Sequence, residues 1–509
     1  MPATARIRID PAFVVGEVRR ELFGSFVEHL GRAVYTGVYE PGHPTADARG
    51  FRRDVIDLVR ELGVSTVRYP GGNFVSGYRW EDGVGPVAER PHRLDLAWHS
   101  TETNEVGLHE FASWLSEVGG ELMLAVNLGT RGVEEALDLL EYANAPVSTT
   151  LTARRAENGH PDPFAVRMWC LGNEMDGPWQ LGHRSADDYG KLAAETARAM
   201  RQLDPGIRLV ACGSSSSSMP TFGAWERTVL THTYELVDYI SCHAYWQEHD
   251  GDLASFLASG QDMDRFIERV VATADAVGAE LQSDKRIDIS FDEWNVWYND
   301  RFENTDKITA LDDWPVAPRL LEDVYTVADA VVVGALLISL VNHADRVAAA
   351  SLAQLVNVIA PIMTEPGGPA WRQTTFFPFA ATSRLARGTA LRAVVDAPRH
   401  ATPRWGEVDS VVAAATRDGD ATAVFLVNRH PTEAIELELD LRSLPPQRLV
   451  GSTALHDADP YAVNSLAEPD RVVPSADTGA ALRGSVLRAT LPPVSWTALE
   501  LRDAREAVR

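Results

Sequence analysis

The stretch AVRMWCLGNE, residues 165–174, decides the fold, because it is an apolar run of strand length that ends in an Asn-Glu pair. A second stretch, RIDISFDEWN at residues 286–295, has the same form and carries Glu293 beside Trp294. A glutamate in a dry core cannot stay ionised without partners. Both stretches are therefore predicted to be strands that deliver a carboxyl to an open end, where the chain turns into a loop and a ligand can reach it.

Similar β-rich runs alternate with longer amphipathic stretches between about residues 18 and 360, which indicates repeated βα units. The eight runs are 22–28, 65–69, 122–127, 166–173, 208–212, 239–245, 287–293 and 347–355. Apolar spacing predicts helices at 48–62, 187–203 and 319–343. Eight strands predict an α/β fold of the (β/α)8 TIM-barrel type, with the functional residues at the C-terminal strand ends. An open doubly wound sheet is the alternative, although no G-x-G-x-x-G follows the first strand.

The pattern changes after about residue 380 to short β-rich runs separated by turn residues, at 408–415, 421–428, 435–441 and 486–491. This pattern of short strands and turns predicts a C-terminal all-β sandwich domain that resembles a jelly roll. The opening runs 5–9 and 13–15 also look like strands, and they precede the first barrel unit. We therefore predict a catalytic barrel over residues 16–380 and a sandwich domain built from residues 1–15 plus 381–509.

Composition restricts the partners. The chain has 509 residues with 47 basic and 72 acidic side chains, a net charge of −25, which disfavours nucleic acid and anionic membranes. Residues 1–20 contain no continuous apolar stretch typical of a signal sequence, and the longest apolar run, 330–341, is too short to span a bilayer. Three sparse cysteines without a CxxC pair fit buried core positions in a reducing compartment. These features predict a cytoplasmic protein.

The two strand-end glutamates, Glu174 and Glu293, suggest cleavage of a glycosidic bond, which needs one carboxyl as acid and one as nucleophile or base. Tyr245 at the end of the sixth strand is placed to donate to Glu293, which favours Glu293 as the ionised nucleophile. Glu174 near Trp169 and Met175 is then the acid. The sequence leaves open whether the carboxyls are about 5 Å apart, as in retaining enzymes, or roughly 6.5–9.5 Å apart, as in inverting ones. A pair of surface ion-paired glutamates is the alternative.

Charged, amide and aromatic groups at the other strand ends are suited to binding sugar hydroxyls and stacking on sugar rings. The predicted substrate-binding residues are Glu28, Arg68, Asn73, Trp98, Asn173, His243, Tyr245, Trp297 and Gln354. Trp179 and Trp246 are further stacking candidates, core packing is the alternative for any of these tryptophans, and a structural role is the alternative for His243. The serine run 214–218 follows a candidate strand end, so a substrate-side loop is one interpretation, and a solvated loop is the simpler one. No HExxH and no G-x-S-x-G are present, so we predict no metal, no cofactor and no serine nucleophile.

Five motifs in this order resemble those of glycoside hydrolase family 51, whose best-known members are intracellular α-L-arabinofuranosidases. The motifs are FGSFVEH (23–29), VRYPGGN (67–73), WCLGNEMDGPWQ (169–180), DEWNVWY (292–298) and LAQLVNV (352–358). The resemblance covers nearly the whole chain. It implies a (β/α)8 barrel with a C-terminal β-sandwich, a retaining mechanism and a hexameric assembly.

The same resemblance implies roles for individual residues. Glu174 would be the acid/base and Glu293 the nucleophile. Arg68 and Trp98 would flank the pocket, and Trp297 would line the side of the leaving group. The arabinofuranosyl ring would be held by Glu28, Asn73, Asn173, Tyr245 and Gln354.

The expected activity is exo-acting release of terminal non-reducing α-L-arabinofuranosyl residues from oligosaccharides or polysaccharides. A β-xylosidase or endoglucanase on the same barrel is one alternative, and a sugar-binding protein without catalysis is another.

Overall fold

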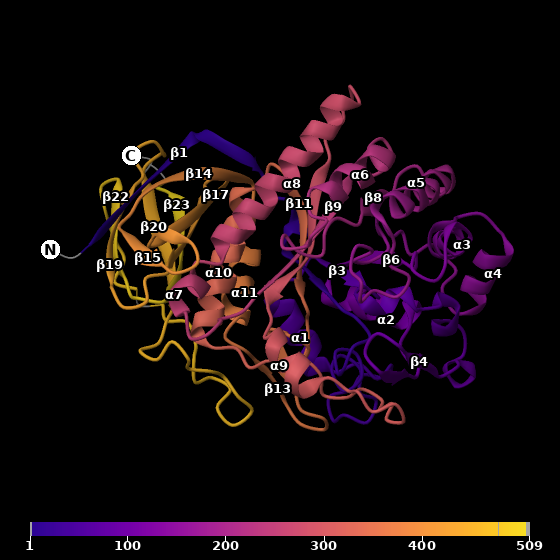
Figure 1. Ribbon diagram of the computed structural model, residues 1–509. Helices are drawn as coiled ribbons and strands as arrows, with labels where there is room; N and C mark the ends of the chain where they lie inside the picture. The colour runs from indigo at the N-terminus through magenta and orange to yellow at the C-terminus, as the bar shows by residue number, and fades with distance from the viewer. Residues whose placement is uncertain (1–2, 477, 505–509) are drawn as a thin grey trace, which may run out of the picture.

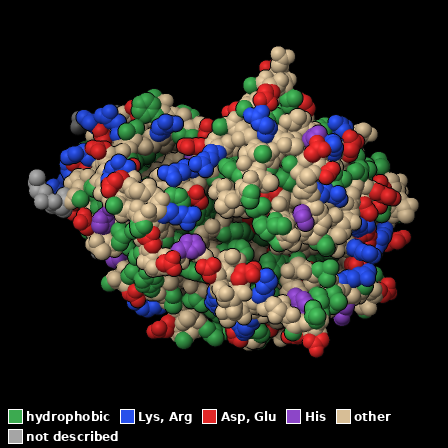
Figure 2. Space-filling model, viewed as in Figure 1, with side chains coloured by type: hydrophobic (Ala, Val, Ile, Leu, Met, Phe, Trp, Pro, Cys, Tyr) green, Lys and Arg blue, Asp and Glu red, His purple; other side chains and the backbone are tan. Residues whose placement is uncertain are grey.

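The computed structural model describes residues 3–476 and 478–504, which form two domains that lie side by side (Figure 1). The barrel lies to the right in this view and a β-sheet domain lies to the left. The first and last described strands both belong to the sheet domain. Acidic and basic side chains are interspersed over the face shown in Figure 2.

Eight of the described strands form a closed barrel in the order β10-β11-β2-β3-β6-β7-β8-β9, with every neighbouring pair parallel. The strands are β2 (Gly24–Phe26), β3 (Thr66–Tyr69), β6 (Glu121–Val126), β7 (Met168–Leu171), β8 (Arg208–Ala211), β9 (Tyr239–Trp246), β10 (Asp288–Val296) and β11 (Val347–Ala353). Each overlaps one of the eight predicted runs, so the barrel prediction is confirmed. The three cysteines lie on or directly after these strands and are buried.

Helices alternate with the barrel strands. Their bounds are α1 (Arg53–Leu62), α2 (Leu108–Val118), α3 (Val133–Asn144), α4 (Thr150–Glu157), α5 (Ala186–Leu203), α6 (Ala224–Thr233), α7 (Leu253–Leu257), α8 (Gly260–Glu280), α9 (Asn299–Arg301), α10 (Val327–Asn342) and α11 (Phe376–Leu385). α5 matches its prediction within one residue, and the side chain of Ser185 caps its start by accepting from the N–H of Asp188. α1 begins later than predicted, since residues 48–50 form a turn and Phe51 and Arg52 make isolated β-bridges. α10 also begins later, where Thr326 and Asp329 form a capping box.

Helix α10 lies between the two domains. It contacts α8 and α11 on the barrel side and β17, β18 and β23 of the sheet domain. All of its residues from Val327 to Val341 are buried, which explains why it is apolar all round. Among the described residues, no helix combines the length and the hydropathy needed to cross a bilayer.

Nine further described strands form the sheet domain, in the order β20-β23-β18-β17-β14-β1-β19-β22-β21. One core cluster contains Leu426 and Leu499 from one half of this sheet and Leu437 and Leu487 from the other, so the sheet folds over on itself. The bounds are β1 (Thr4–Glu17), β14 (Thr389–Asp396), β17 (Val411–Asp418), β18 (Ala421–Asn428), β19 (Ile435–Asp440), β20 (Gln447–Leu455), β21 (Ala481–Arg483), β22 (Val486–Leu491) and β23 (Ser495–Asp503).

The sheet domain follows the prediction with local differences. The two opening runs form the single strand β1, which pairs with β14 with register shifts on either side of Val14 and pairs with β19 in continuous register. The predicted run 408–415 is divided between β17 and a small hairpin, β15 (Arg399–Thr402) with β16 (Gly406–Asp409). The other short pairs are β4 (Arg93–Asp95) with β5 (Ser100–Glu102) and β12 (Ile362–Thr364) with β13 (Ala370–Arg372). Helix α11 runs across residue 380, so the domain limits stay a prediction.

Candidate active site

A cavity of about 640 Å³ opens at the C-terminal ends of the barrel strands, where a (β/α)8 barrel places its functional groups. Both predicted catalytic glutamates line it. So do six of the predicted substrate-binding residues: Glu28, Asn73, Trp98, Tyr245, Trp297 and Gln354. The other three do not line it within the described chain, and each contacts a residue that does: Arg68 contacts Glu293, Asn173 contacts Asn73, and His243 contacts Glu174.

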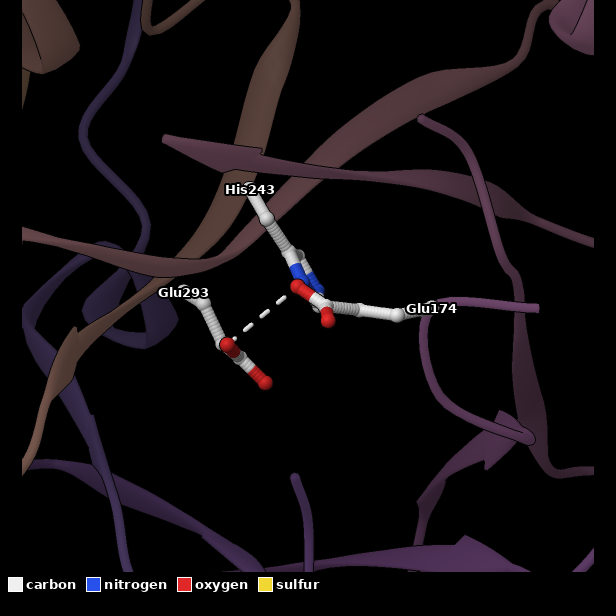
Figure 3. A group of neighbouring side chains, drawn as sticks. All are labelled: Glu174, His243 and Glu293. Atoms are coloured by element: carbon white, nitrogen blue, oxygen red, sulfur yellow. Dashed lines mark hydrogen bonds and ion pairs between the residues drawn. The ribbon is translucent and has the colours of Figure 1, made fainter. Parts of the chain in front are cut away.

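The two glutamates converge across the barrel mouth. Glu293 lies on β10, and Glu174 follows β7 with a φ of 41°, a left-handed conformation that is costly for a residue with a side chain. One carboxylate oxygen of Glu174 lies within 4.8 Å of one of Glu293. Figure 3 shows the two carboxyl groups reaching toward each other with the His243 ring beside Glu174. The pair therefore lies within the reach of a single sugar ring.

Glu293 is surrounded by strong donors. Nη1 of Arg68 donates to Oε1 at 2.7 Å, and the Tyr245 hydroxyl donates to Oε2 at 2.8 Å, as the sequence analysis expected of Tyr245. Burial and the charge of Glu174 raise the pKa of Glu293 overall, and the charges of His243 and Arg68 and the Tyr245 hydrogen bond oppose this shift. The ionised form that a nucleophile needs therefore depends on these three partners.

Glu174 has a different environment. The indole Nε1 of Trp179 donates to Oε2 at 2.8 Å, and Nδ1 of His243 lies 2.9 Å from Oε1. Within the described chain no Arg or Lys forms an ion pair with Glu174, whereas Glu293 pairs directly with Arg68. Two carboxyls with such unequal partners are suited to unequal roles.

His243 lies between the carboxyl groups of Glu174 and Glu293 and contacts both. Its Nδ1 faces Glu174 at 2.9 Å and Glu293 at 3.5 Å, and its Nε2 faces Asp292 at 2.9 Å. Burial disfavours a charged imidazole, but the charge of Glu293 and hydrogen bonds to Asp292 and Glu174 outweigh it and raise the pKa of His243 to about 10. Glu174, His243 and Glu293 have the donor types and spacing of a metal site. A doubly protonated imidazole has no free lone pair, so His243 would have to lose the proton that it shares with Glu174 before it could bind a metal.

Asp292 is a site residue that the sequence analysis did not assign. Besides holding His243, its Oδ2 lies 3.8 Å from Nε of Arg68, so it contacts the partners of both glutamates. Adjacent residues of a strand normally point to opposite faces, which would turn Asp292 away from Glu293. The pairing of β10 with β9 shifts register between Ser290 and Glu293, and its pairing with β11 shifts at the same point. This bulge brings both carboxylates into the barrel.

The opposite end of the cavity is organised around Glu28. Its Oε1 accepts from the backbone N–H of Phe74 at 2.9 Å and from Trp98 Nε1 at 2.7 Å, and its own N–H donates to Gln354 at 3.1 Å. Burial raises the pKa of Glu28 well above its usual range. A Cβ at Gly72 would lie 2.1 Å from this carboxyl, so the close approach requires glycine there.

A parallel barrel that presents two convergent glutamates to one cavity defines the class of glycoside hydrolases. Family models match two segments of the chain: the α-L-arabinofuranosidase 1 domain over residues 58–260 and the α-L-arabinofuranosidase C-terminal domain over residues 292–495. The chain therefore belongs to the α-L-arabinofuranosidases of glycoside hydrolase family 51, as the resemblance of its motifs implied.

Individual relatives are similar over almost the whole chain. An intracellular exo-α-(1→5)-L-arabinofuranosidase of Streptomyces lividans is 62% identical over 98% of this chain and 76% of its own length. An exo-α-(1→6)-L-arabinofuranosidase of Bifidobacterium longum is 58% identical over 98% of this chain and 97% of its own. The solved structure of AbfB, a family 51 α-L-arabinofuranosidase of Bifidobacterium longum, superposes with a TM-score of 0.95 at 48% identity, covering 99% of this chain and 100% of that one.

Proposed function

We propose that this protein is a retaining exo-α-L-arabinofuranosidase that releases terminal non-reducing α-L-arabinofuranosyl residues by double displacement. The observation that carries the proposal is the short approach of the two carboxyl groups, with oxygens within 4.8 Å. Retaining glycosidases hold their carboxyls about 5 Å apart, whereas an inverting enzyme needs roughly 6.5–9.5 Å to place a water between carboxyl and sugar.

In the first step, a Glu293 oxygen attacks the anomeric carbon, and the bond from that carbon to the leaving oxygen breaks. The proton of Glu174 passes to the leaving oxygen, so the aglycone departs as an alcohol. Arg68 and Tyr245 hold Glu293 in place for the attack, since each makes a hydrogen bond of 2.8 Å or less to a different carboxylate oxygen. The product is an arabinosyl ester of Glu293.

In the second step, Glu174 is ionised and takes a proton from water, and that water attacks the anomeric carbon. The ester bond to Glu293 breaks, the carboxylate is restored, and arabinose leaves with its original configuration. Two inversions at one carbon give net retention. The reaction uses only these carboxyls and water, so the proposal needs no cofactor.

The sugar ring is proposed to lie between the catalytic pair and Glu28. Asn73, Tyr245 and Gln354 line this part of the cavity, and Trp98 donates to Glu28 at its edge. His243, Arg68 and Asn173 are proposed to act by positioning the groups that touch the sugar, because they lie behind the cavity surface.

Several relatives are named intracellular exo-arabinofuranosidases, which supports a cytoplasmic enzyme acting on arabinose-containing oligosaccharides. The relatives' names do not favour the β-xylosidase and endoglucanase alternatives. The homohexamer remains a prediction from the family resemblance, which light scattering of the purified protein tests.

The proposal is tested by following one reaction with NMR. An aryl α-L-arabinofuranoside should be hydrolysed, and the first anomer to appear should be α-arabinofuranose. Aryl β-D-xyloside and β-glucan serve as competing substrates. First formation of the β-anomer would contradict retention, and turnover of the xyloside or glucan without turnover of the arabinofuranoside would favour an alternative.

A further inference from the structure

The loop that carries Glu174 is joined to the loop after the neighbouring strand. Glu174 opens a tight turn, in which the N–H of Gly177 donates to the carbonyl of Glu174 at 2.9 Å, and Asp176 lies inside this turn. The N–H and the hydroxyl of Ser215 both donate to Oδ2 of Asp176, at 3.0 and 3.1 Å. Ser215 follows β8, which pairs with β7 in the barrel. These two hydrogen bonds, the Asp176–Ser215 clamp, therefore connect two adjacent strand ends.

The Asp176 carboxyl depends on Ser215 for its position. Asp176 is 9% exposed, and its other oxygen, Oδ1, is buried and has no hydrogen-bond partner within the described chain. Burial and the charge of Glu174 raise the pKa of Asp176 to about 6, while the hydrogen bonds from Ser215 and the charge of His243 oppose this shift. The carboxyl is therefore close enough to Glu174 to interact with its charge.

The loop after β8 holds the other side of the clamp in place. The N–H of Gly213 donates to the hydroxyl of Ser241 on β9 at 3.0 Å. The N–H of Ser214 donates to the fully buried carboxylate of Glu226 at 2.8 Å. Ser215 itself is 7% exposed and lies in the cavity lining. The β8 side of the clamp is thus fixed by neighbouring elements of the barrel.

The serine run differs from its simpler interpretation. Residues 215–218 line the cavity and Ser214 is fully buried, so the interpretation of the run as a solvated loop is wrong and the run lies on the side of the cavity. The hydroxyls of Ser216 and Ser218 bond to each other at 2.9 Å, whereas the hydroxyl of Ser215 bonds to Asp176. Ser215 is therefore the member of the run that contacts the turn of the acid.

The backbone of Glu174 explains why the turn needs support. Its φ of 41° is a conformation that persists only where surrounding contacts hold it. Two of these contacts come from the same loop: the N–H of Arg184 donates to the carbonyl of Met175 at 3.0 Å, and Trp179 donates to the Glu174 carboxyl at 2.8 Å. The Asp176–Ser215 clamp adds a connection to the neighbouring strand. Without it, the turn that aims the Glu174 carboxyl would be free to shift.

A general acid transfers its proton only from within hydrogen-bond reach of the leaving oxygen. A displacement of about 1 Å at a reacting group can lower the rate by about 10²-fold. We propose that Asp176 is a positioning residue for the general acid, and that it acts through Ser215 to direct the Glu174 carboxyl at the leaving oxygen. Asp176 is not among the described residues that line the cavity, so it acts without touching the substrate. This inference rests on the proposed arabinofuranosidase function.

The test uses a series of aryl α-L-arabinofuranosides whose leaving groups differ in pKa. Asp176→Ala removes both hydrogen bonds to Ser215. For the poorest leaving groups, which need the proton most, kcat/KM should fall by about 10- to 100-fold. For a strongly activated nitrophenyl group it should change little. The logarithm of kcat/KM should therefore fall more steeply with leaving-group pKa than in the wild type, which a loss of stability alone would not cause.

Two milder variants test whether the hydrogen bonds carry the effect. Asp176→Asn keeps a side-chain oxygen that can accept both bonds, so it should retain most of the wild-type dependence on the leaving group. Ser215→Ala removes only the bond from the hydroxyl and should give a smaller change in the same direction as Asp176→Ala. It replaces Asp176→Ala in the comparison if that variant does not fold.

Asp238→Ala is the matched control. Asp238 also accepts from the N–H of a β8 residue, Leu209, at 2.7 Å, but it does so near the other end of the strand and is not in the cavity lining. This variant should lower Tm and leave the dependence on the leaving group unchanged.

Three results would overturn the positioning role. They are an equal fall of kcat/KM for all leaving groups in Asp176→Ala, no fall for any of them, and an Asp176→Asn variant that behaves like Asp176→Ala. Absence of wild-type activity on every arabinofuranoside would instead refute the proposed function, so the two failures are distinguishable.

Discussion

The floor and the rim of the cavity hold their side chains in different ways. The floor comprises Glu293 and the three charged groups directly beneath the cavity surface, Arg68, His243 and Asp292; all four are at most 5% exposed and contact one another in a continuous set of charged pairs. On the rim, Trp179 is 53% exposed and is held by a single hydrogen bond. Floor residues interact through ion pairs in a low-dielectric setting, so a substitution at one should alter the effect of a substitution at its neighbours. Rim residues should act nearly independently.

The largest effect is expected on the floor at the nucleophile. Glu293→Ala should lower kcat by more than about 10⁴-fold, because no covalent intermediate can form. Added azide should partly restore turnover and yield an arabinosyl azide, since it fits the space left by the carboxyl. Product analysis with and without azide measures this, and an unrescued variant with intact fold would remove Glu293 from the nucleophile role.

Glu174→Ala should have an effect that depends on the substrate. For poor leaving groups, such as another sugar, the loss should be about 10²–10⁴-fold, which is the usual contribution of a general acid. For an activated aryl group the first step needs less proton transfer, so the loss should be smaller. Equal losses across a series of aryl arabinofuranosides of varied leaving-group pKa would argue against Glu174 as the acid.

Asp292→Asn tests whether the floor acts as one unit. The amide keeps the size of the side chain but removes the charge that pairs with His243 and lies near Arg68. We expect kcat/KM to fall by about 10²-fold and its pH profile to shift, because both glutamates lose the support of their partners. A fall without any change in the pH profile would mean that Asp292 serves only the fold.

Trp297→Ala makes the corresponding change on the rim. The Trp297 ring packs edge-on against Tyr245 at 5.1 Å, and its Nε1 has no hydrogen-bond partner within the described chain. Removing it should raise KM about tenfold with little change in kcat, the worth of one aromatic contact. Michaelis–Menten kinetics measure this, and a loss as large as that of Asp292→Asn would break the distinction between floor and rim.

The last prediction concerns stability and pH. Because the pKa of His243 is raised to about 10 in the fold, the folded protein binds up to one proton more than the unfolded chain between about pH 6.5 and about pH 10. The stabilisation from this proton is complete below about pH 6.5 and is lost as the pH rises to about 10. The Tm difference between wild type and His243→Gln should therefore be greater at about pH 6.5 than at about pH 10. Equal differences at both pH values would mean that His243 is not charged.

The sequence predicted the barrel strands well, because each was a short apolar run between amphipathic stretches. It placed the start of α10 too early, since apolar periodicity cannot show that the helix begins at the Thr326 cap. Glu174, Glu293 and Tyr245 were predictable because each lies at the C-terminal end of a strand. In a closed barrel these strand ends surround one opening. How closely their side chains approach depends on the three-dimensional closure of the barrel, which no local pattern encodes.

Other parts of the site could not have been predicted from local patterns. The inward orientation of Asp292 depends on a register shift against two neighbouring strands, and nothing in the run 286–295 marks it. Arg404 and Trp405 line the cavity only because the hairpin that carries them, which is distant in the sequence, docks on α7. Such contacts join segments about 150 residues apart, so single-sequence periodicity carries no signal for them.

The burial of α10 between barrel and sheet has a consequence for engineering. A chain cut after the last barrel strand would leave the side of this helix that contacts β17, β18 and β23 in water, where its apolar residues would drive self-association. The β-rich portion is thus an obligatory partner of the catalytic portion. Attempts to transplant the barrel alone into another scaffold should fail at expression, before any loss of chemistry is measured.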